Sequence, residues 1–187
     1  MIIREARATD AVGMARVNVE SWKSAYAGVV PQEYLDSVSF EQRASTWQAR
    51  LSDPSKIMPG WFYIVAEENK EIIGLAGGGP ERSGNQIYTG EIGAIYLLKS
   101  HQGRGVGHQL ITTVALRLKK QGHNSMLVWV LRENPYRAFY EALGGKQFAQ
   151  RQINIGGADL IEVAYGWRDL NIFKKPVYAP TAETPPR

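Results

Sequence analysis

The sequence contains no cysteine among its 187 residues. Disulfide bonds, thiolate metal sites and a cysteine nucleophile are therefore excluded. No stretch approaches the ~18 consecutive apolar residues that a membrane-spanning helix needs. The first ten residues, MIIREARATD, carry arginine and acidic residues where a secretory signal has an apolar core. We therefore expect an intracellular, cytoplasmic protein with no membrane partner.

Blocks of basic residues are also absent, although the chain is basic overall, with 22 Lys and Arg against 18 Asp and Glu and a formal net charge of +4. Proteins that bind single-stranded nucleic acid interleave aromatic with basic residues. This chain does not, so we expect no nucleic-acid partner. Its three histidines, His101, His108 and His123, lack the spacing of zinc ligands, and no G-x-S-x-G segment of a serine hydrolase occurs. We therefore expect no metal.

The chain does contain a regular succession of strand and helix patterns. Hydrophobic residues make up 44% of it and charged residues 21%, which is typical of one globular domain. Apolar runs and alternations predict strands over 2–7, 61–67, 72–77, 91–98, 126–131, 147–155 and 160–167. Helices are expected from 9 or 10, 31, 40, 105 and 134 onwards. This order predicts an α/β (α+β) fold in which a mixed sheet carries helices on both faces.

A glycine-rich loop, QGRGVG, joins the strand segment EIGAIYLL to an expected helix whose apolar stripe includes Val106, Leu110, Val114 and Leu118. The first turn of a helix has free backbone N–H groups and the positive end of the helix dipole. Glycines lack the Cβ atoms that would keep a ligand away. An anion, most naturally a phosphate, fits there, with Arg104 adding a fixed charge. For such a loop taken alone, the alternative is a tight turn that binds nothing.

A second segment, ENPYRAFYEALGG, follows the next expected strand. With the glycine loop and its flanking strands, it resembles the GCN5-related N-acetyltransferase (GNAT) superfamily. The family's Q/R-x-x-G-x-G/A signature matches Gln102, Gly105 and Gly107, and its later Asn-to-Tyr helix segment matches Asn134 and Tyr140. The resemblance implies a GNAT-like mixed, mostly antiparallel central sheet of about seven strands with helices on both faces.

The resemblance covers residues 1–168, which we expect to form the GNAT domain, and residues 169–187 form a Pro-rich C-terminal extension. One departure concerns the residues after the Asn-to-Tyr helix. Relatives usually read Leu-Gly-Phe there, whereas this chain has Leu143, Gly144 and Gly145. Packing near the acceptor pocket therefore departs from the family pattern.

The resemblance also implies acetyl-CoA as co-substrate, with loop amides on the diphosphate and the pantetheine paired with the backbone of the strand before the loop. The residues expected to bind it are Ile95, Tyr96, Leu97, Gln102, Gly103, Arg104, Gly105, Val106, Gly107, His108 and Asn134. Gly93 lies inside that strand, where glycine often marks a bulge. The family's bulge at this place, which parts the sheet for the cofactor, is one explanation of Gly93. A small residue beneath a bulky neighbour is the other.

Two residues are expected to carry the chemistry. An alkylammonium, with a pKa near ~10.4, must lose a proton before it can attack a thioester. Glu91 is the candidate base, since an equivalent glutamate serves several relatives, and strand alternation places it on one face with Gly93, Ile95 and Leu97. Tyr140 matches the family's general acid, which protonates the departing thiolate. The structural alternatives are a surface carboxylate for Glu91 and a core aromatic residue for Tyr140.

Trp22 and Tyr26 lie four residues apart and are expected to line the acceptor pocket, with aromatic core packing as the alternative. The leading hypothesis is an acetyl-CoA-dependent N-acetyltransferase acting on a primary amine of a small molecule. Direct attack fits the absence of cysteine, since no thiol can carry an acyl intermediate. Protein or peptide amine acetylation and a non-catalytic CoA-binding or sensing module are the alternatives. Because relatives often dimerise, a homodimer is a possible assembly.

Overall fold

The computed structural model describes residues 1–174, so residues 175–187 of the expected extension lie outside the described residues. The strands are β1 (Ile2–Glu5), β2 (Phe62–Glu68), β3 (Glu71–Pro80), β4 (Gly90–Leu97), β5 (Met126–Leu131), β6 (Lys146–Ile155) and β7 (Ala158–Trp167). The α-helices are α1 (Ala11–Tyr26), α2 (Gln32–Ser37), α3 (Phe40–Ser52), α4 (Val106–Lys120) and α5 (Arg137–Ala142). This succession confirms the predicted order of strands and helices.

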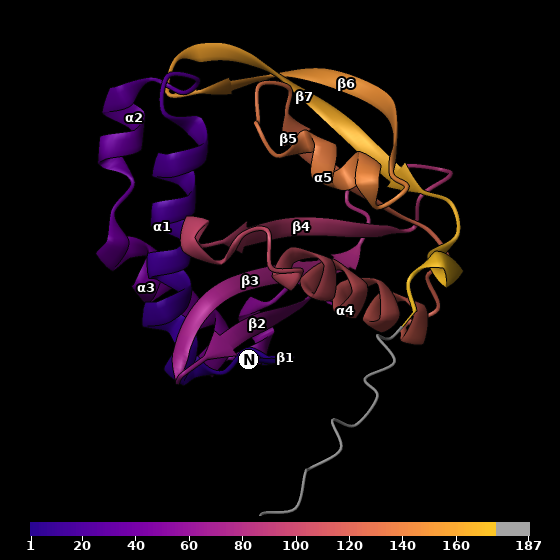
Figure 1. The fold of residues 1–187 in the computed structure, drawn as a ribbon, viewed down its shortest axis with the longest axis horizontal. Coiled ribbons are helices and arrows are strands. Elements are labelled where there is room, and N and C mark those ends of the chain that lie inside the picture. Colours follow the sequence, from indigo (N-terminus) through magenta and orange to yellow (C-terminus); the bar gives the residue numbers. More distant parts are fainter. Residues whose placement is uncertain (175–187) are drawn as a thin grey trace, which may run out of the picture.

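The strands form one sheet in the order β1-β2-β3-β4-β5-β7-β6. β4 and β5 run parallel, and the other neighbouring pairs are antiparallel. Helices α1 and α3 cover one face, while α4 and α5 lie on the other (Figure 1). The mixed, mostly antiparallel sheet with helices on both faces is therefore confirmed.

Two hairpins of the sheet close through two-residue turns. Asn69 and Lys70, between β2 and β3, both have positive φ, as a two-residue primed turn requires. Gly156 and Gly157 do the same between β6 and β7, with φ of +60° and +85°. Such turns match the right-handed twist of the flanking strands. A two-residue turn can therefore set the pairing of the two strands that it joins.

Helix α4 buries the stripe that its apolar spacing predicts. Leu110, Val114 and Leu118 have no exposed surface, and Val106 is 2% exposed. The helix ends before Gly122, whose φ of +92° is the left-handed conformation of a C-terminal cap. The stripe fixes α4 against the sheet, so the start of the helix stays directly beside the end of β4.

Helix α5 begins later than its sequence indicates. A helix was expected from residue 134 onwards, but the first helical residue is Arg137. The Asn134 carboxamide oxygen accepts a hydrogen bond from the Tyr136 backbone N–H at 2.8 Å, forming a turn before the helix. This local bond competes with helical geometry at the same residues, which explains the later start.

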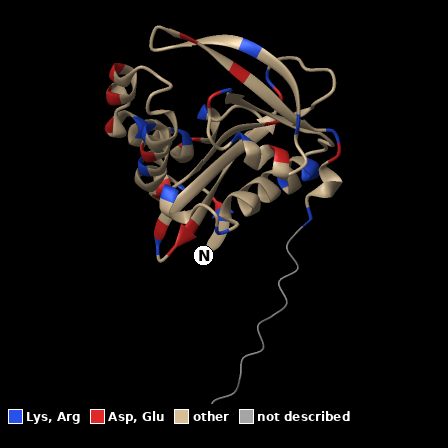
Figure 2. Cartoon of the chain, turned by 45° about the horizontal axis from the view of Figure 1, so that its top comes forward, with Lys and Arg blue, Asp and Glu red and all other residues tan. Residues whose placement is uncertain are grey.

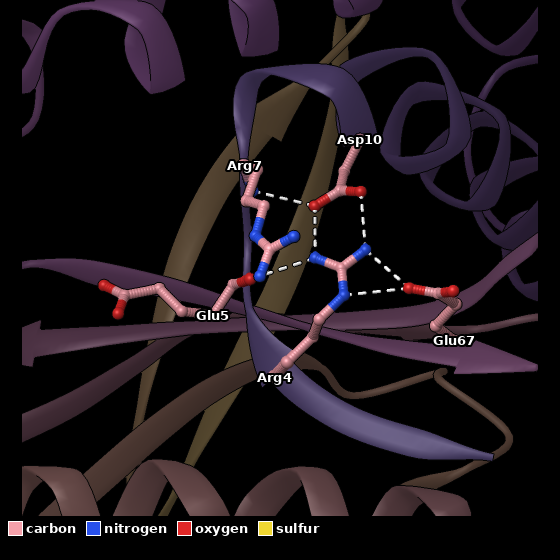
Figure 3. Close-up of polar contacts among 5 residues, drawn as sticks. All are labelled: Arg4, Glu5, Arg7, Asp10 and Glu67. Carbon is pink, nitrogen blue, oxygen red and sulfur yellow. Dashed lines mark hydrogen bonds and ion pairs between the residues drawn. The ribbon is translucent and has the colours of Figure 1, made fainter. Parts of the chain in front are cut away.

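An arginine in β1 ties the first helix to the sheet (Figure 3). The Arg4 guanidinium donates to both carboxylate oxygens of Asp10, at 2.7 and 2.8 Å, and to Glu67 in β2. Burial alone would raise the pKa of Asp10, but hydrogen bonds from Arg4 and from the Arg7 amide lower it below its usual value. The network holds the start of α1, so the far end of that helix has a defined position over β4.

Two residues of the expected extension pack on the domain. Leu170 and Phe173 are 1% and 5% exposed and belong to the main apolar core.

The surface carries both charges: lysine and arginine alternate with acidic residues over helices and hairpins instead of gathering on one face (Figure 2). Within residues 1–174, no helix is long and apolar enough to cross a membrane.

Candidate active site

The site begins where two neighbouring strands part. β4 pairs with β5 only over Gly90–Ile92 and Met126–Val128 in the described part of the chain. At the same point the register between β3 and β4 skips one residue, because Gly77 opposes Ala94 and Gly78 opposes Ile92. Gly93 is the extra residue, which confirms the predicted bulge. A bulge bends its strand, and here β4 leaves β5.

Both explanations of Gly93 hold at once, because a Cβ there would overlap the Trp61 ring. The bulge also corrects the expected alternation. Glu91 opposes Gly79, whose open side faces the Trp61 indole, while Leu97 opposes Gly74, whose open side faces α4. Glu91 and Leu97 therefore lie on opposite faces of the sheet. The prediction that they share a face was wrong because it assumed a regular strand.

The parted strands open a cavity of about 490 Å³. The expected site residues that line it are Tyr26, Ile95, Tyr96, Leu97, Gln102, Gly103, Gly105, Gly107, His108, Asn134 and Tyr140. The expected residues that do not line it are Trp22, Glu91, Arg104 and Val106. A volume of this size is typical of a site for a ligand as large as a cofactor arm.

Sequence reasoning missed two walls of this cavity. They are formed by Ser21, Ser24 and Ala25 of α1 and by Val128, Trp129 and Val130 of β5. The α1 residues share small side chains about one turn apart, a weak signal that a helix face approaches a ligand. The β5 residues carry no such signal, because their backbone becomes accessible only through the parting from β4.

The glycine loop presents backbone donors to this cavity. Gly103 and Gly105 have φ of +74° and +77°, and a Cβ at either position would meet no other atom within 4 Å. The N–H groups of residues 103–108 have no hydrogen-bond acceptor among residues 1–174, whereas Gln102 N–H bonds Lys99 and Gln109 N–H bonds Gly105. A run of free donors at the start of α4 fits an anionic diphosphate. Binding of the diphosphate by this loop stays a prediction.

Two loop residues that were expected to bind the cofactor, Arg104 and Val106, have side chains that contact other parts of the protein. The Arg104 guanidinium lies 3.1 Å from Glu68, at the end of β2, and His101 lies 3.4 Å from the same carboxylate. The Val106 side chain is buried in the core. Val106 therefore offers its backbone N–H alone, and the Arg104 charge is already partly matched.

Tyr140 is both a core residue and a cavity residue. It is 6% exposed, stacks on Tyr165 at 5.7 Å and meets Trp167 edge to face. Burial raises its pKa, so the phenol keeps its proton at neutral pH. No hydrogen bond engages its hydroxyl within the described range, which leaves that hydroxyl available to a molecule in the cavity.

The two expected acceptor residues differ in position. Tyr26 lines the cavity and its hydroxyl accepts a hydrogen bond from the Asn134 side-chain amide at 2.8 Å. Burial raises the pKa of Tyr26 to about 12. Trp22 lies behind it, with ring centroids 4.9 Å apart, and donates from its indole N–H to the Tyr96 hydroxyl at 3.1 Å. Trp22 therefore orients two cavity residues without lining the cavity itself.

Glu91 is 5% exposed, and Arg82 engages both of its carboxylate oxygens. The Arg82 backbone N–H and Nε donate to one oxygen at 3.2 and 3.0 Å, and a terminal guanidinium nitrogen donates to the other. Arg82 in turn lies over the Trp61 ring, 4.4 Å from its centroid. Glu91 thus lies next to the bulge but on the Trp61 face, which leaves its role as base a prediction.

In the described part of the chain, no group of three or more His, Asp or Glu side chains is arranged to hold a metal ion. The cavity itself is lined by the glycine loop, by Gly93 and by Tyr140. The arrangement suits binding of an extended anionic thioester along β4.

The comparisons with known proteins agree with this geometry. The family model for FR47-like proteins matches residues 84–153, which span β4 to most of β6. The phosphinothricin N-acetyltransferase of Streptomyces viridochromogenes is 24% identical over 161 residues, covering 84% of this chain and 85% of its own. In fold, the chain is similar to the PaiA N-acetyltransferase of Thermoplasma acidophilum in complex with coenzyme A, with a TM-score of 0.62, 21% identity and coverage of 87% and 96%.

The N-acetyltransferase YuaI of Bacillus subtilis (strain 168), itself uncharacterized, is 36% identical over 172 residues. The alignment covers 92% of this chain and 95% of YuaI, so it includes the bulged strand, the glycine loop and the Asn-to-Tyr segment together. With sequence similarity over the whole domain, a GNAT sheet and the parted strands, the chain belongs to the GCN5-related N-acetyltransferase superfamily.

Proposed function

We propose that the protein transfers an acetyl group from acetyl-CoA to a primary amine of a small molecule by direct attack. The observation that carries the proposal is the cavity between β4 and β5, onto which both the glycine loop and Tyr140 open. The loop supplies free N–H groups for the diphosphate, and the open backbone of β4 can pair with the amides of the pantetheine. A thioester bound this way would lie between the parted strands.

In the proposed reaction the amine nitrogen attacks the acetyl carbonyl carbon, a C–N bond forms and the C–S bond breaks. The leaving thiolate takes a proton from the Tyr140 hydroxyl, and solvent restores that proton. A phenol holds its proton at neutral pH, and because burial raises the pKa of Tyr140 and weakens it as an acid, it donates only when the sulfur carries negative charge. Its contacts with Tyr165 and Trp167 limit ring motion and keep the hydroxyl in place.

Glu91 remains the proposed base. Since Arg82 engages its carboxylate and the side chain does not line the cavity, we propose that the amine proton reaches it through water at the Gly93 bulge. The contacts with Arg82 fix the position of the carboxylate beside the bulge. We also propose a cytoplasmic location and a homodimer. Light scattering on purified protein measures the mass of the assembly and so tests the homodimer.

Release of free thiol tests the proposed function. The protein is mixed with acetyl-CoA and a panel of small primary amines, and the free thiol is measured against samples without amine. Amine-stimulated release supports transfer. Binding of CoA without amine-stimulated release would contradict it and favour a non-catalytic CoA-binding module.

A further inference from the structure

Helix α5, which carries Tyr140, is too short to hold its own position. It has six residues, Arg137–Ala142, and Tyr140 is the only one of the six that is buried. Isolated helices shorter than ~12–15 residues are marginal in water. The place of the Tyr140 hydroxyl in the cavity therefore depends on what packs against this helix.

Trp167, the last residue of β7, packs against both the ring of Tyr140 and the end of α5. It is 2% exposed, and its ring meets Tyr140 edge to face with centroids 6.5 Å apart. Its indole N–H donates to the carbonyl of Leu143, the residue that caps the helix, at 2.9 Å. The last carbonyls of a helix have no partner within the helix. One side chain of β7 therefore holds the proposed acid and also the helix end behind it.

The approach of Trp167 to the helix end requires the glycine at position 145, where the family pattern has phenylalanine. A Cβ on Gly145 would lie 2.7 Å from the Trp167 ring and 2.8 Å from the Tyr140 carbonyl oxygen. Nonbonded carbon atoms pack best at about 3.5–4.0 Å, so any other residue would push the indole or the helix end away. The departure from the family pattern after α5 therefore accompanies the Trp167 contact.

Trp167 is supported in turn by the expected C-terminal extension. Phe173 is 5% exposed and meets the Trp167 ring edge to face, with centroids 5.9 Å apart. The backbone N–H of Leu170 donates to the Asn124 carbonyl at 3.0 Å, which fixes this segment beside the start of β5. The rings of Phe173, Trp167 and Tyr140 therefore follow one another from the extension to the cavity, and the first two do not line it.

We propose that Trp167, supported by Phe173, is a positioning residue that sets the place of the Tyr140 hydroxyl in the cavity. The inference rests on the proposed transferase function, in which Tyr140 protonates the departing thiolate, and extends it to residues outside the cavity. Proton transfer needs a hydrogen bond of about 2.6–3.2 Å, and displacing a reacting group by about 1 Å can cost about 100-fold in rate. The extension as far as Phe173 then belongs to the catalytic unit.

Trp167→Phe is the first test, because it keeps a ring against Tyr140 and removes the indole N–H that holds Leu143. Thiol release is measured with the amine that gives the fastest release from the unaltered protein. We expect kcat to fall about tenfold, while the KM for acetyl-CoA and the calorimetric affinity for CoA change by less than about twofold. A folded variant with unaltered kcat, or one that loses CoA affinity instead, would overturn the inference and leave the transferase function standing.

Trp47→Phe is the matched control for the loss of stability. Trp47 lies in α3 on the other face of the sheet, is 7% exposed and meets Tyr63 edge to face. The substitution removes the same atoms from the core, so it should lower the melting temperature without lowering kcat. An equal loss of kcat in both tryptophan variants would mean general destabilisation and would refute the role of Trp167. If Trp167→Phe does not fold, Phe173→Leu removes only the support and should lower kcat about threefold with CoA affinity retained.

The decisive arm repeats Trp167→Phe in a Tyr140→Phe background. A residue that acts only through the Tyr140 hydroxyl has no further effect on kcat once that hydroxyl is gone. The same fold-loss in both backgrounds would show a merely structural role and refute the proposal. An unaltered kcat for Tyr140→Phe alone would also overturn it, with transfer intact. Absence of amine-stimulated thiol release from the unaltered protein would defeat the transferase function and this inference together.

Discussion

Replacing Gly105 with alanine tests whether the loop amides hold the diphosphate. Gly105 has φ of +77°, and a Cβ there would have open space, so the substitution introduces backbone strain alone. An L-residue in this left-handed region costs about 1–2 kcal/mol. The loop can relieve that strain by leaving the conformation that presents its N–H groups, and ligand binding must then restore it. Affinity for CoA should therefore fall by about 5- to 30-fold, since ~1.4 kcal/mol corresponds to tenfold.

Gly122 provides the matched control for that experiment. Its φ is +92° and its surroundings are equally open, but it follows the far end of α4. The helix between the two glycines has 15 residues and is about 22 Å long at ~1.5 Å per residue. Gly122→Ala should lower the melting temperature by about 2–4 °C per kcal/mol of strain and leave CoA binding unchanged.

Calorimetric titration with CoA and thermal melts of the two variants separate the possible results. Gly105→Ala should show the affinity loss, whereas Gly122→Ala should show only the loss of stability. If Gly105→Ala binds CoA as the unaltered protein does, although it melts as early as Gly122→Ala, the loop amides do not hold the diphosphate. The assignment of the cavity to acetyl-CoA would then lose its main support.

Three further predictions concern proton transfer and stability. Tyr140→Phe should lower kcat with little change in CoA affinity, because it removes the donor and keeps the ring packing; an unaltered kcat would exclude Tyr140 as the acid. Glu91→Gln should lower kcat/KM near pH 7 and recover as the pH approaches the pKa of the amine, ~10.4, where no base is needed; an equal loss at every pH would make Glu91 structural. Because folding lowers the pKa of Asp10, the stability that its ionised form contributes is present above the unfolded pKa, near ~3.9, and is lost as the pH falls through the folded value. Thermal melts should therefore separate Asp10→Asn from the unaltered protein at pH 7 and bring them together in acid; a constant difference would refute the role of Arg4.

The sequence predicted an element correctly wherever the structure of that element depends on residues close to it in the chain. The stripe from Val106 to Leu118 predicted α4 because one helix face must be buried, and the helix ends before Gly122, which has the positive φ that few other residues adopt. Likewise, the strands expected over 147–155 and 160–167 form a hairpin around Gly156 and Gly157, and β6 pairs with β7 on both sides of a register shift between Gln147 and Ala149. In each case the energetic preference lies within a few residues of the position concerned.

The site could be predicted only in part, since several of its properties depend on contacts far apart in the chain. Gly93 indicated a bulge, but not that Glu91 and Leu97 consequently face opposite sides of the sheet. The partner of Arg104, Glu68, is 36 residues away and meets it only after the β2–β3 hairpin forms. The β5 wall of the cavity exists because that strand loses a neighbour, which no property of its own residues specifies.

The parting of β4 from β5 leaves two strand edges in the interior of a sheet instead of at its rim. Unpaired edges normally invite addition of a strand from another chain, the first step of aggregation. Here α1 and α5 flank the gap, so a polypeptide cannot easily enter it, but a slender molecule with amide groups of its own can add itself as the missing strand. We therefore expect the open edges to pair with a narrow amide-bearing molecule and to exclude a wider chain.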